Sequence, residues 1–235
     1  MPLPLVPIVT VIIAMTLRSD TKPVKVYVKK PRGTLYWGGA GLDGPYIKPQ
    51  IAAFGNAGIK NISVGLTNTA TREFPDWLSA VGTPIDALRS GLLIRFEDND
   101  DWVISSGMNT TAPQFNIIGY SYGSLLAAQT AWFYAKQGNI VDHLVLIGSP
   151  IDGDFLAKLK AHKNIKKVVI IDLLTFGDKI YAGIPEKTLI ESAPILVKQM
   201  TAGQGEGHFY YAHITKDSPR RWKELAERLY SEGLR

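Results

Sequence analysis

The sequence of 235 residues contains no cysteine. This absence excludes disulfides, thiolate nucleophiles and cysteine-based zinc sites, and it leaves the cellular compartment open. Charge is also sparse: charged residues make up 20% of the chain, and the net charge is only +5. No basic run carries the interleaved aromatic side chains that bind nucleic-acid strands. We therefore expect no nucleic-acid partner.

A hydrophobic run of comfortable membrane-spanning length is also missing. The apolar stretch at residues 3–17 is only about fifteen residues long, and it lacks the basic start and the cleavage pattern of a signal peptide. The β-branched residues 8–13 favour a strand. We expect residues 1–24 to form an apolar N-terminal arm or strand, with a membrane anchor or a truncated signal as alternatives. The sequence does not decide between cytoplasm and export.

Residues 114–136 contain three features in a fixed order. Residues 115–118 are an apolar run of the size of a buried parallel strand, and residues 119–123 read Gly-Tyr-Ser-Tyr-Gly. Residues 124–136 are spaced to form one helical face from Leu125, Ala128, Trp132 and Ala135. A G-x-S-x-G turn between strand and helix is typical of the nucleophile elbow of serine hydrolases, with glycines where side chains would collide. Ser121 is the predicted nucleophile.

A glycine-rich loop follows the strand expected at residues 34–37. Residues 38–41 read Gly-Gly-Ala-Gly, and Asp43 and Pro45 predict the start of a helix that ends near Gly58. With a strand at residues 61–66, this forms a parallel βαβ unit. The loop lacks the ending of a phosphate-binding P-loop. In a serine hydrolase the same place supplies an oxyanion-hole N–H, so Ala40 and Tyr122 are the predicted donors; simple turn flexibility is the alternative.

The remaining elements predict a single α/β domain over residues 1–235. An outer strand is expected at residues 25–28, and further strands at residues 142–147, 167–172 and 194–200. Helices are expected at residues 155–162 and 219–230. Residues 67–111 are irregular and could form a lid, and the acidic residues 97–101 indicate a solvated turn. The central sheet is therefore expected to be mostly parallel.

A serine nucleophile needs a base, and the chain offers four histidines. His143 begins an expected strand at the end opposite the elbow, which favours a structural role. His162 ends a lysine-rich helix and is expected to be solvated or to cap the helix. His208 lies in a Gly-Glu-Gly-His loop beyond the expected last strand, at the sheet edge where sites of α/β proteins gather. His208 is the predicted base, with His213 as the alternative.

The third member of such a site is a carboxylate that holds the base. Asp178 lies in a Phe-Gly-Asp loop after the strand expected at residues 167–172, and from a loop it could reach sideways to an imidazole. Asp172 ends that strand and could instead bond the backbone. Asp178 is the predicted acid, Asp172 is the alternative, and Asp152 and Asp154 are more remote ones.

Taken together, these motifs resemble the α/β-hydrolase superfamily. The resemblance rests on the Gly-Tyr-Ser-Tyr-Gly elbow, the Gly-Gly-Ala-Gly loop, the Phe-Gly-Asp and Gly-Glu-Gly-His segments, and the chain order Ser121, Asp178, His208. It implies an α/β-hydrolase fold with helices on both faces of the sheet, little or no cap domain, and hydrolysis through an acyl-enzyme without metal or cofactor. Gly38 departs from the pattern, because many lipases carry histidine there.

The substrate prediction depends on the apolar and aromatic residues around the expected site. Trp37, Tyr120 and Phe209, with Gly39, are the predicted substrate-binding residues; core packing is the alternative for the aromatic ones. Together with the apolar N-terminus and the positive charge, they favour a lipid or other hydrophobic ester and peripheral membrane contact. A thioesterase or an acyltransferase with the same three residues is the alternative within this superfamily. A non-catalytic binding module of this fold and a nucleotide-binding domain are the alternatives from other classes.

Overall fold

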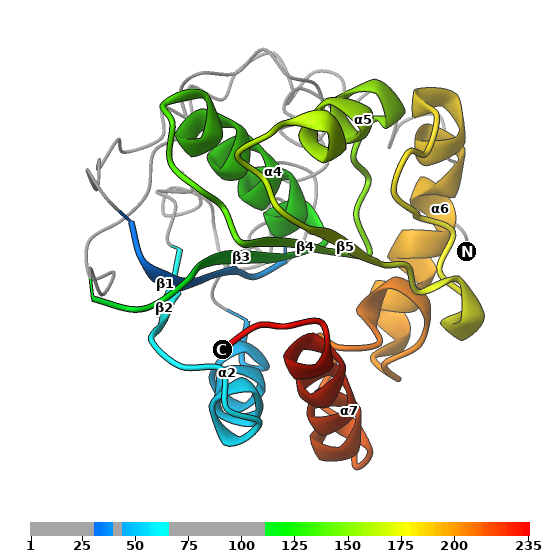
Figure 1. Cartoon of the computed structure of the whole chain (residues 1–235). Coiled ribbons are helices and arrows are strands. Elements are labelled where there is room, and N and C mark those ends of the chain that lie inside the picture. Colours follow the sequence, from blue (N-terminus) through cyan, green and yellow to red (C-terminus); the bar gives the residue numbers. More distant parts are fainter. Residues whose placement is uncertain (1–30, 40–43, 66–110) are drawn as a thin grey trace, which may run out of the picture.

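The computed structural model describes residues 31–39, 44–65 and 111–235 (Figure 1). The expectations for the N-terminal arm, the outer strand at residues 25–28, the acidic turn and the lid lie outside these ranges. So do Ala40 and Asp43.

The described residues contain one parallel sheet of five strands, in the order β2-β1-β3-β4-β5. The strands are β1 (Gly33–Trp37), β2 (Ile62–Val64), β3 (Phe115–Tyr120), β4 (His143–Ile147) and β5 (Val168–Ile171). Every residue of β1, β3 and β4 is buried. Such apolar runs are typical of parallel strands covered on both faces. Five of the predicted strands are therefore confirmed, with their ends shifted by one or a few residues.

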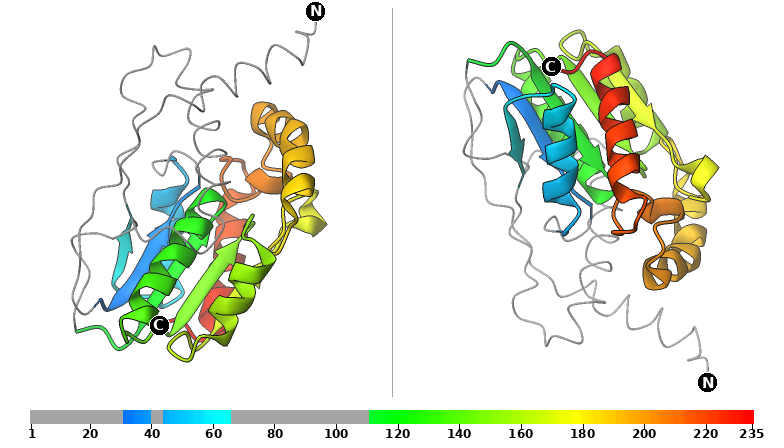
Figure 2. Two further views of the ribbon diagram at one scale, coloured as in Figure 1. Left: turned by 90° about the horizontal axis from the view of Figure 1, so that it is seen from above. Right: turned by 90° about the horizontal axis from the view of Figure 1, so that it is seen from below.

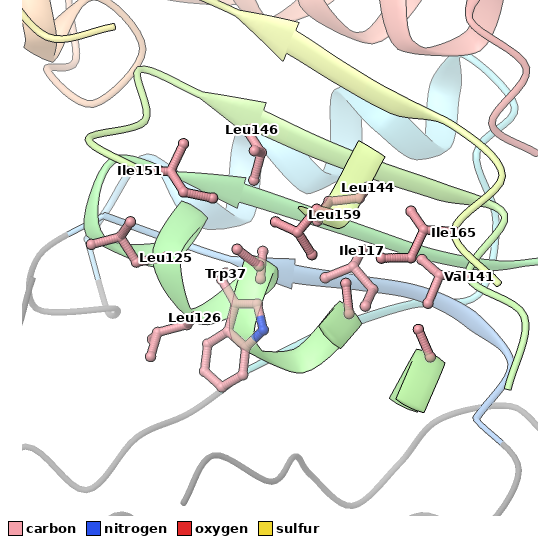
Figure 3. Packing of buried hydrophobic residues seen from close by; sticks show 14 of the residues in the cluster. Trp37, Ile117, Leu125, Leu126, Val141, Leu144, Leu146, Ile151, Leu159 and Ile165 are labelled. Carbon is pink, nitrogen blue, oxygen red and sulfur yellow. The ribbon is translucent and has the colours of Figure 1, made fainter. Parts of the chain in front are cut away.

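Helices cover both faces of the sheet (Figures 1 and 2). The helices α4 (Tyr122–Lys136) and α5 (Gly153–Ala161) lie on one face, and α2 (Ile47–Asn56) and α7 (Ser218–Ser231) lie on the other. Each face has its own hydrophobic core. Successive strand residues point to opposite faces, so Trp37 packs on the α4 side and Tyr36 on the α2 side. Figure 3 shows Trp37 in the core with Leu126 and Leu144. The fold is α/β.

The helix that follows the elbow is more deeply buried than predicted. Twelve of the fifteen residues of α4 are buried, whereas a single apolar face was expected. Ala127, Ala128, Ala131 and Ala135 have no exposed surface. Small side chains let the helix pack closely against the sheet and also against the neighbouring helix α5. The alanine-rich composition of this segment therefore reflects close packing.

The strand predicted at residues 194–200 is wrong, because these residues belong to the helix α6 (Glu186–Ala202). Leu189, Ser192 and Gln199 are its buried residues, and their spacing is helical. Pro194 lies inside the helix but is exposed. Figure 1 shows α6 beside the β5 end of the sheet.

The start of α2 also differs from the prediction. Its N-cap is Tyr46, and a turn precedes it in which the Ile47 N–H donates to the Gly44 carbonyl oxygen at 3.0 Å. Pro45 lies in this turn. Among the residues described, no helix is long and apolar enough to cross a membrane.

Candidate active site

Ser121 lies between β3 and α4 in a strained backbone conformation. Its φ is 54° and its ψ is −126°. A non-glycine residue in such a region costs about 1–3 kcal/mol and persists only where its surroundings enforce the conformation. The Ser121 N–H donates to the Ile147 carbonyl oxygen at 2.8 Å. The Ser121 carbonyl oxygen accepts from both the backbone N–H and the hydroxyl of Ser124. These contacts hold the turn in the geometry that lifts the serine above the sheet.

The two glycines of the elbow are required because the backbones approach one another closely. A Cβ on Gly123 would lie 1.9 Å from the Gly38 carbonyl oxygen and 2.6 Å from that of Trp37. A Cβ on Gly119 would lie 2.4 Å from the Gly123 carbonyl oxygen. Real Cβ atoms do not approach backbone atoms so closely. The predicted steric need for glycine on either side of the serine is confirmed.

Three side chains form a continuous hydrogen-bonded chain. The Ser121 Oγ lies 2.6 Å from His208 Nε2, and His208 Nδ1 lies 2.8 Å from Asp178 Oδ2. The other carboxylate oxygen, Oδ1, accepts the Ile180 N–H at 2.9 Å. An ionised carboxylate can only accept, so in the neutral imidazole the proton is assigned to Nδ1. Nε2 is then the acceptor for the Ser121 hydroxyl.

The predicted acid and the predicted base stand on short turns beyond the sheet. Asp178 follows β5 and the 3₁₀ turn η2 (Leu174–Phe176), and His208 lies in the 3₁₀ turn η3 (Gly207–Phe209). Asp178 and His208 are buried, with 2% and 5% of their surface exposed, whereas Ser121 is half-buried. Of these three hydrogen-bonded side chains, the serine is therefore the one that a ligand reaches most easily. Its position beyond the carboxyl end of β3 is the usual location of sites on parallel sheets.

The alternative acid and base residues have other partners. Asp172 Oδ1 accepts the Ala182 N–H at 3.0 Å, and burial raises the pKa of this carboxyl. His213 Nδ1 accepts the Gly205 N–H at 3.3 Å, and burial lowers the pKa of this imidazole. His143 is the first residue of β4, so it lies at the opposite end of the strands from Ser121. The structure brings together Ser121, His208 and Asp178.

The predicted oxyanion-hole residues are only partly described. Ala40 lies outside the described ranges. Tyr122 is the first residue of α4, so its N–H lies at the positive end of the helix dipole and next to Ser121. Gly39 is buried, and its N–H donates to the Tyr46 hydroxyl at 2.6 Å. Tyr46 therefore holds the main chain of Gly39, a role that no local sequence signal indicated.

The predicted substrate-binding aromatic residues occupy different environments. Trp37 is 2% exposed and packs in the core on the α4 side, which is the alternative left open above. Tyr120 is also buried, and its hydroxyl donates to the His208 carbonyl oxygen. Phe209 is half-buried, lies edge-on to His208 and stacks on His213. Of the three, Phe209 alone retains substantial exposed surface beside the base.

Two further contacts support the site and were missed by sequence reasoning. The Ser124 Oγ lies 2.8 Å from the Oγ of buried Ser149, which joins the start of α4 to the loop after β4. Gln199 contacts the main chain on both sides of the site: it donates to the Gly177 carbonyl oxygen and accepts the His208 N–H. The strand wrongly predicted at residues 194–200 concealed the inward position of Gln199.

In the three described ranges, no group of three or more His, Cys, Asp or Glu residues could hold a metal ion. No protein-family model matches the sequence, and a search of curated proteins finds no significant match.

Proposed function

We propose that this protein is a serine hydrolase of the α/β-hydrolase type that cleaves a carboxylic ester. The observation that carries the proposal is the hydrogen-bonded chain from Ser121 Oγ through His208 to Asp178, with the serine on a strained turn at the start of a helix. A nucleophile bonded to a base that is held by a third group is the arrangement that activates a serine hydroxyl.

In the first half of the proposed reaction, the Ser121 Oγ attacks the ester carbonyl carbon while His208 Nε2 takes the hydroxyl proton. The imidazolium that forms is stabilised by Asp178, which keeps the Nδ1 proton in its hydrogen bond. Charge develops on the carbonyl oxygen, and N–H groups of Tyr122 and Ala40 are its proposed donors. Losing one such donor costs about 3 kcal/mol of transition-state stabilisation.

The tetrahedral intermediate formed by this attack then collapses to the acyl-enzyme, and His208 gives its proton to the leaving alcohol, which completes the first half. Water then attacks the acyl-enzyme, with His208 as base once more, and the acid is released. A thioester would use the same residues with a thiol as leaving group, and an acyltransferase would replace water by another acceptor.

A hydrophobic substrate is supported by exposed apolar side chains in the part of the sequence that supplies the proposed acid and base. Within the described ranges, six of the seven large hydrophobic residues that are exposed lie between residues 174 and 214, the stretch that supplies the acid and the base. They are Leu174, Phe176, Ile190, Ile195, Val197 and Ile214. We expect an ester with an apolar acyl chain, presented by a lipid surface or by a substrate aggregate.

The test is turnover of nitrophenyl esters of increasing acyl length by the parent protein and by Ser121→Ala. We expect hydrolysis by the parent, with kcat/KM rising as the acyl chain lengthens. Ser121→Ala should fold and lose nearly all turnover. If the variant kept the activity of the parent, Ser121 would not be the nucleophile. Thioester substrates and an added alcohol acceptor in the same assay distinguish the three acyl-transfer reactions.

A further inference from the structure

Gln199 lies on the inward face of α6 and reaches both catalytic loops. Its Nε2 donates to the Gly177 carbonyl oxygen at 2.9 Å, and its Oε1 accepts the His208 N–H at 3.0 Å. Gly177 directly precedes the acid Asp178. One side chain, 8% exposed, therefore links the main chain of the acid loop to the main chain of the base.

The chemistry of these two contacts requires an amide. A carbonyl oxygen can only accept and a backbone N–H can only donate, so the bridging side chain must offer one donor and one acceptor at the same end. These partners also assign the orientation of the amide. A carboxylate would lose the donor to Gly177, an ammonium would lose the acceptor for His208, and asparagine has a shorter stem.

The backbone around the amide is shaped to receive it. Gly207 has a φ of 55°, and a Cβ at this position would lie between 2.0 and 2.3 Å from three atoms of the Gln199 amide group. The amide therefore lies directly against the main chain of Gly207, where any side chain would displace it. This explains why glycine precedes His208 in the Gly-Glu-Gly-His segment.

The other side of the His208 main chain is held as well. The His208 carbonyl oxygen accepts from the hydroxyl of Tyr120, the residue directly before Ser121. A second series of hydrogen bonds thus runs alongside the triad, from Gly177 through Gln199 to His208, and on to Tyr120. It fixes the main chains that carry the acid and the base, while the triad itself connects their side chains.

We infer that Gln199 is a positioning residue, which sets the distance and angle of His208 relative to Asp178 and Ser121. The inference rests on the proposed function and deepens it. Gln199 need not contact substrate, so its loss should reduce kcat and leave KM nearly unchanged. A small displacement of a reacting group can cost about 100-fold in rate. We expect Gln199→Met, which has similar volume and no amide, to lower kcat about 10- to 100-fold.

The experiment compares Gln199→Met with Gln199→Glu and Ser192→Ala. Gln199→Glu keeps the acceptor for the His208 N–H and should retain an intermediate kcat. Ser192 is buried on the same helix, but its hydroxyl donates to the Thr188 carbonyl oxygen within α6. Ser192→Ala therefore controls for loss of helix stability, and it should leave kcat within about twofold of the parent once both proteins are folded.

A second measurement tests the positioning role of Gln199 separately from the proposed hydrolase function. In NMR spectra, the hydrogen-bonded His208 Nδ1 proton should be visible in the parent and in Ser121→Ala, and should be lost or exchange faster in Gln199→Met. An unchanged Nδ1 signal and unchanged kcat in Gln199→Met would overturn the inference. If the parent gave no turnover but Gln199→Met still lost the signal, the proposed function would fail and the positioning role would stand.

Discussion

The strands of the parallel sheet have a buried histidine in a hydrogen-bonded cluster at each of their two ends, and the clusters are built in different ways. We call the end where the strands finish the carboxyl edge and the end where they begin the amino edge. At the carboxyl edge, His208 joins Ser121 to Asp178, and all three residues stand on turns that follow strands or helices. At the amino edge, His143 Nδ1 bonds the Asn116 side-chain oxygen at 2.8 Å, and Asn116 Nδ2 donates to the Thr34 hydroxyl at 3.2 Å.

The amino-edge cluster follows from strand register alone. Thr34, Asn116 and His143 are register partners across β1, β3 and β4, so their side chains stand in one row. Each of the three is buried, at 9% exposure or less. Asn116 Nδ2 also donates to Gln114 Oε1 at 3.0 Å, and Gln114 in turn donates to the Gly233 carbonyl oxygen and accepts the Arg235 N–H. His143 bonds an amide oxygen in this row and holds strands together, whereas His208 lies between a carboxylate and a half-exposed hydroxyl, which is the arrangement on which we base its proposed proton transfer.

The largest expected effect comes from substituting the two histidines in turn. His208→Ala should lower kcat on the order of 10⁴-fold or more, because the base is lost. His143→Ala should leave kcat per folded molecule unchanged and destabilise the protein. Kinetics on folded samples and urea unfolding of both variants check this contrast; a loss of kcat in His143→Ala would remove the distinction between the two edges.

The two aspartates after β5 give the next contrast. Asp178→Asn should reduce kcat about 10³- to 10⁴-fold, because an amide can donate to Nδ1 and so favours the wrong tautomer. Asp172→Asn should leave kcat unchanged. Burial raises the pKa of Asp172 above 3.8, so ionisation of this carboxyl is less favourable in the folded protein than in the unfolded chain. Replacing it by a neutral asparagine should therefore stabilise the folded protein at pH 7. Equal kinetic losses in the two variants would contradict the assignment of the acid.

Breaking the row of the amino edge should affect stability without affecting catalysis. Asn116→Ala leaves the Thr34 hydroxyl and the His143 ring without their partner, which should cost about 2–3 kcal/mol of unfolding free energy. Asn139→Ala is the control, since half-buried Asn139 donates one long bond to the Tyr134 carbonyl oxygen at 3.3 Å. It should cost under about 1 kcal/mol. Urea titration measures both; similar losses would show that the row carries no special stability.

The smallest effect is a dependence of stability on pH that originates at the amino edge. Burial is the main cause that lowers the pKa of His143 below 6.5, so the folded protein favours its neutral form. The unfolded chain binds a proton near pH 6.5, and stability therefore falls as the pH drops below that value. The loss stops once the pH lies below the pKa of the folded state. The difference in unfolding free energy between the parent and His143→Gln should follow this curve, whereas a difference independent of pH would contradict it.

Much of the carboxyl edge could be predicted because its signals are local. The elbow glycines, the strand before Ser121 and the loop around Asp178 lie in short segments whose residue types report their backbone geometry. His208 was selected for a reason that proved wrong, since the segment before it is helix α6 and not a strand. The apolar run at residues 195–197 imitated a strand, and two of the three buried residues of α6, Ser192 and Gln199, are polar.

The amino edge could not be predicted beyond the structural role of His143. Its row joins Thr34, Asn116 and His143 through the register of three strands, and no local pattern encodes that register. The same holds for Gln199 and Tyr46, whose partners lie on other turns of the fold. Hydrogen bonds between distant segments need the packed structure, because side chains such as Gln or Tyr are common in many environments.

The proposed function requires Ser121 to be an activated nucleophile. Its most direct test is the intact mass of the protein after incubation with a fluorophosphonate, alongside Ser121→Ala and His143→Gln. We expect a single adduct on the parent and on His143→Gln, and none on Ser121→Ala. A folded parent that forms no adduct, or a Ser121→Ala protein that still forms one, would contradict it.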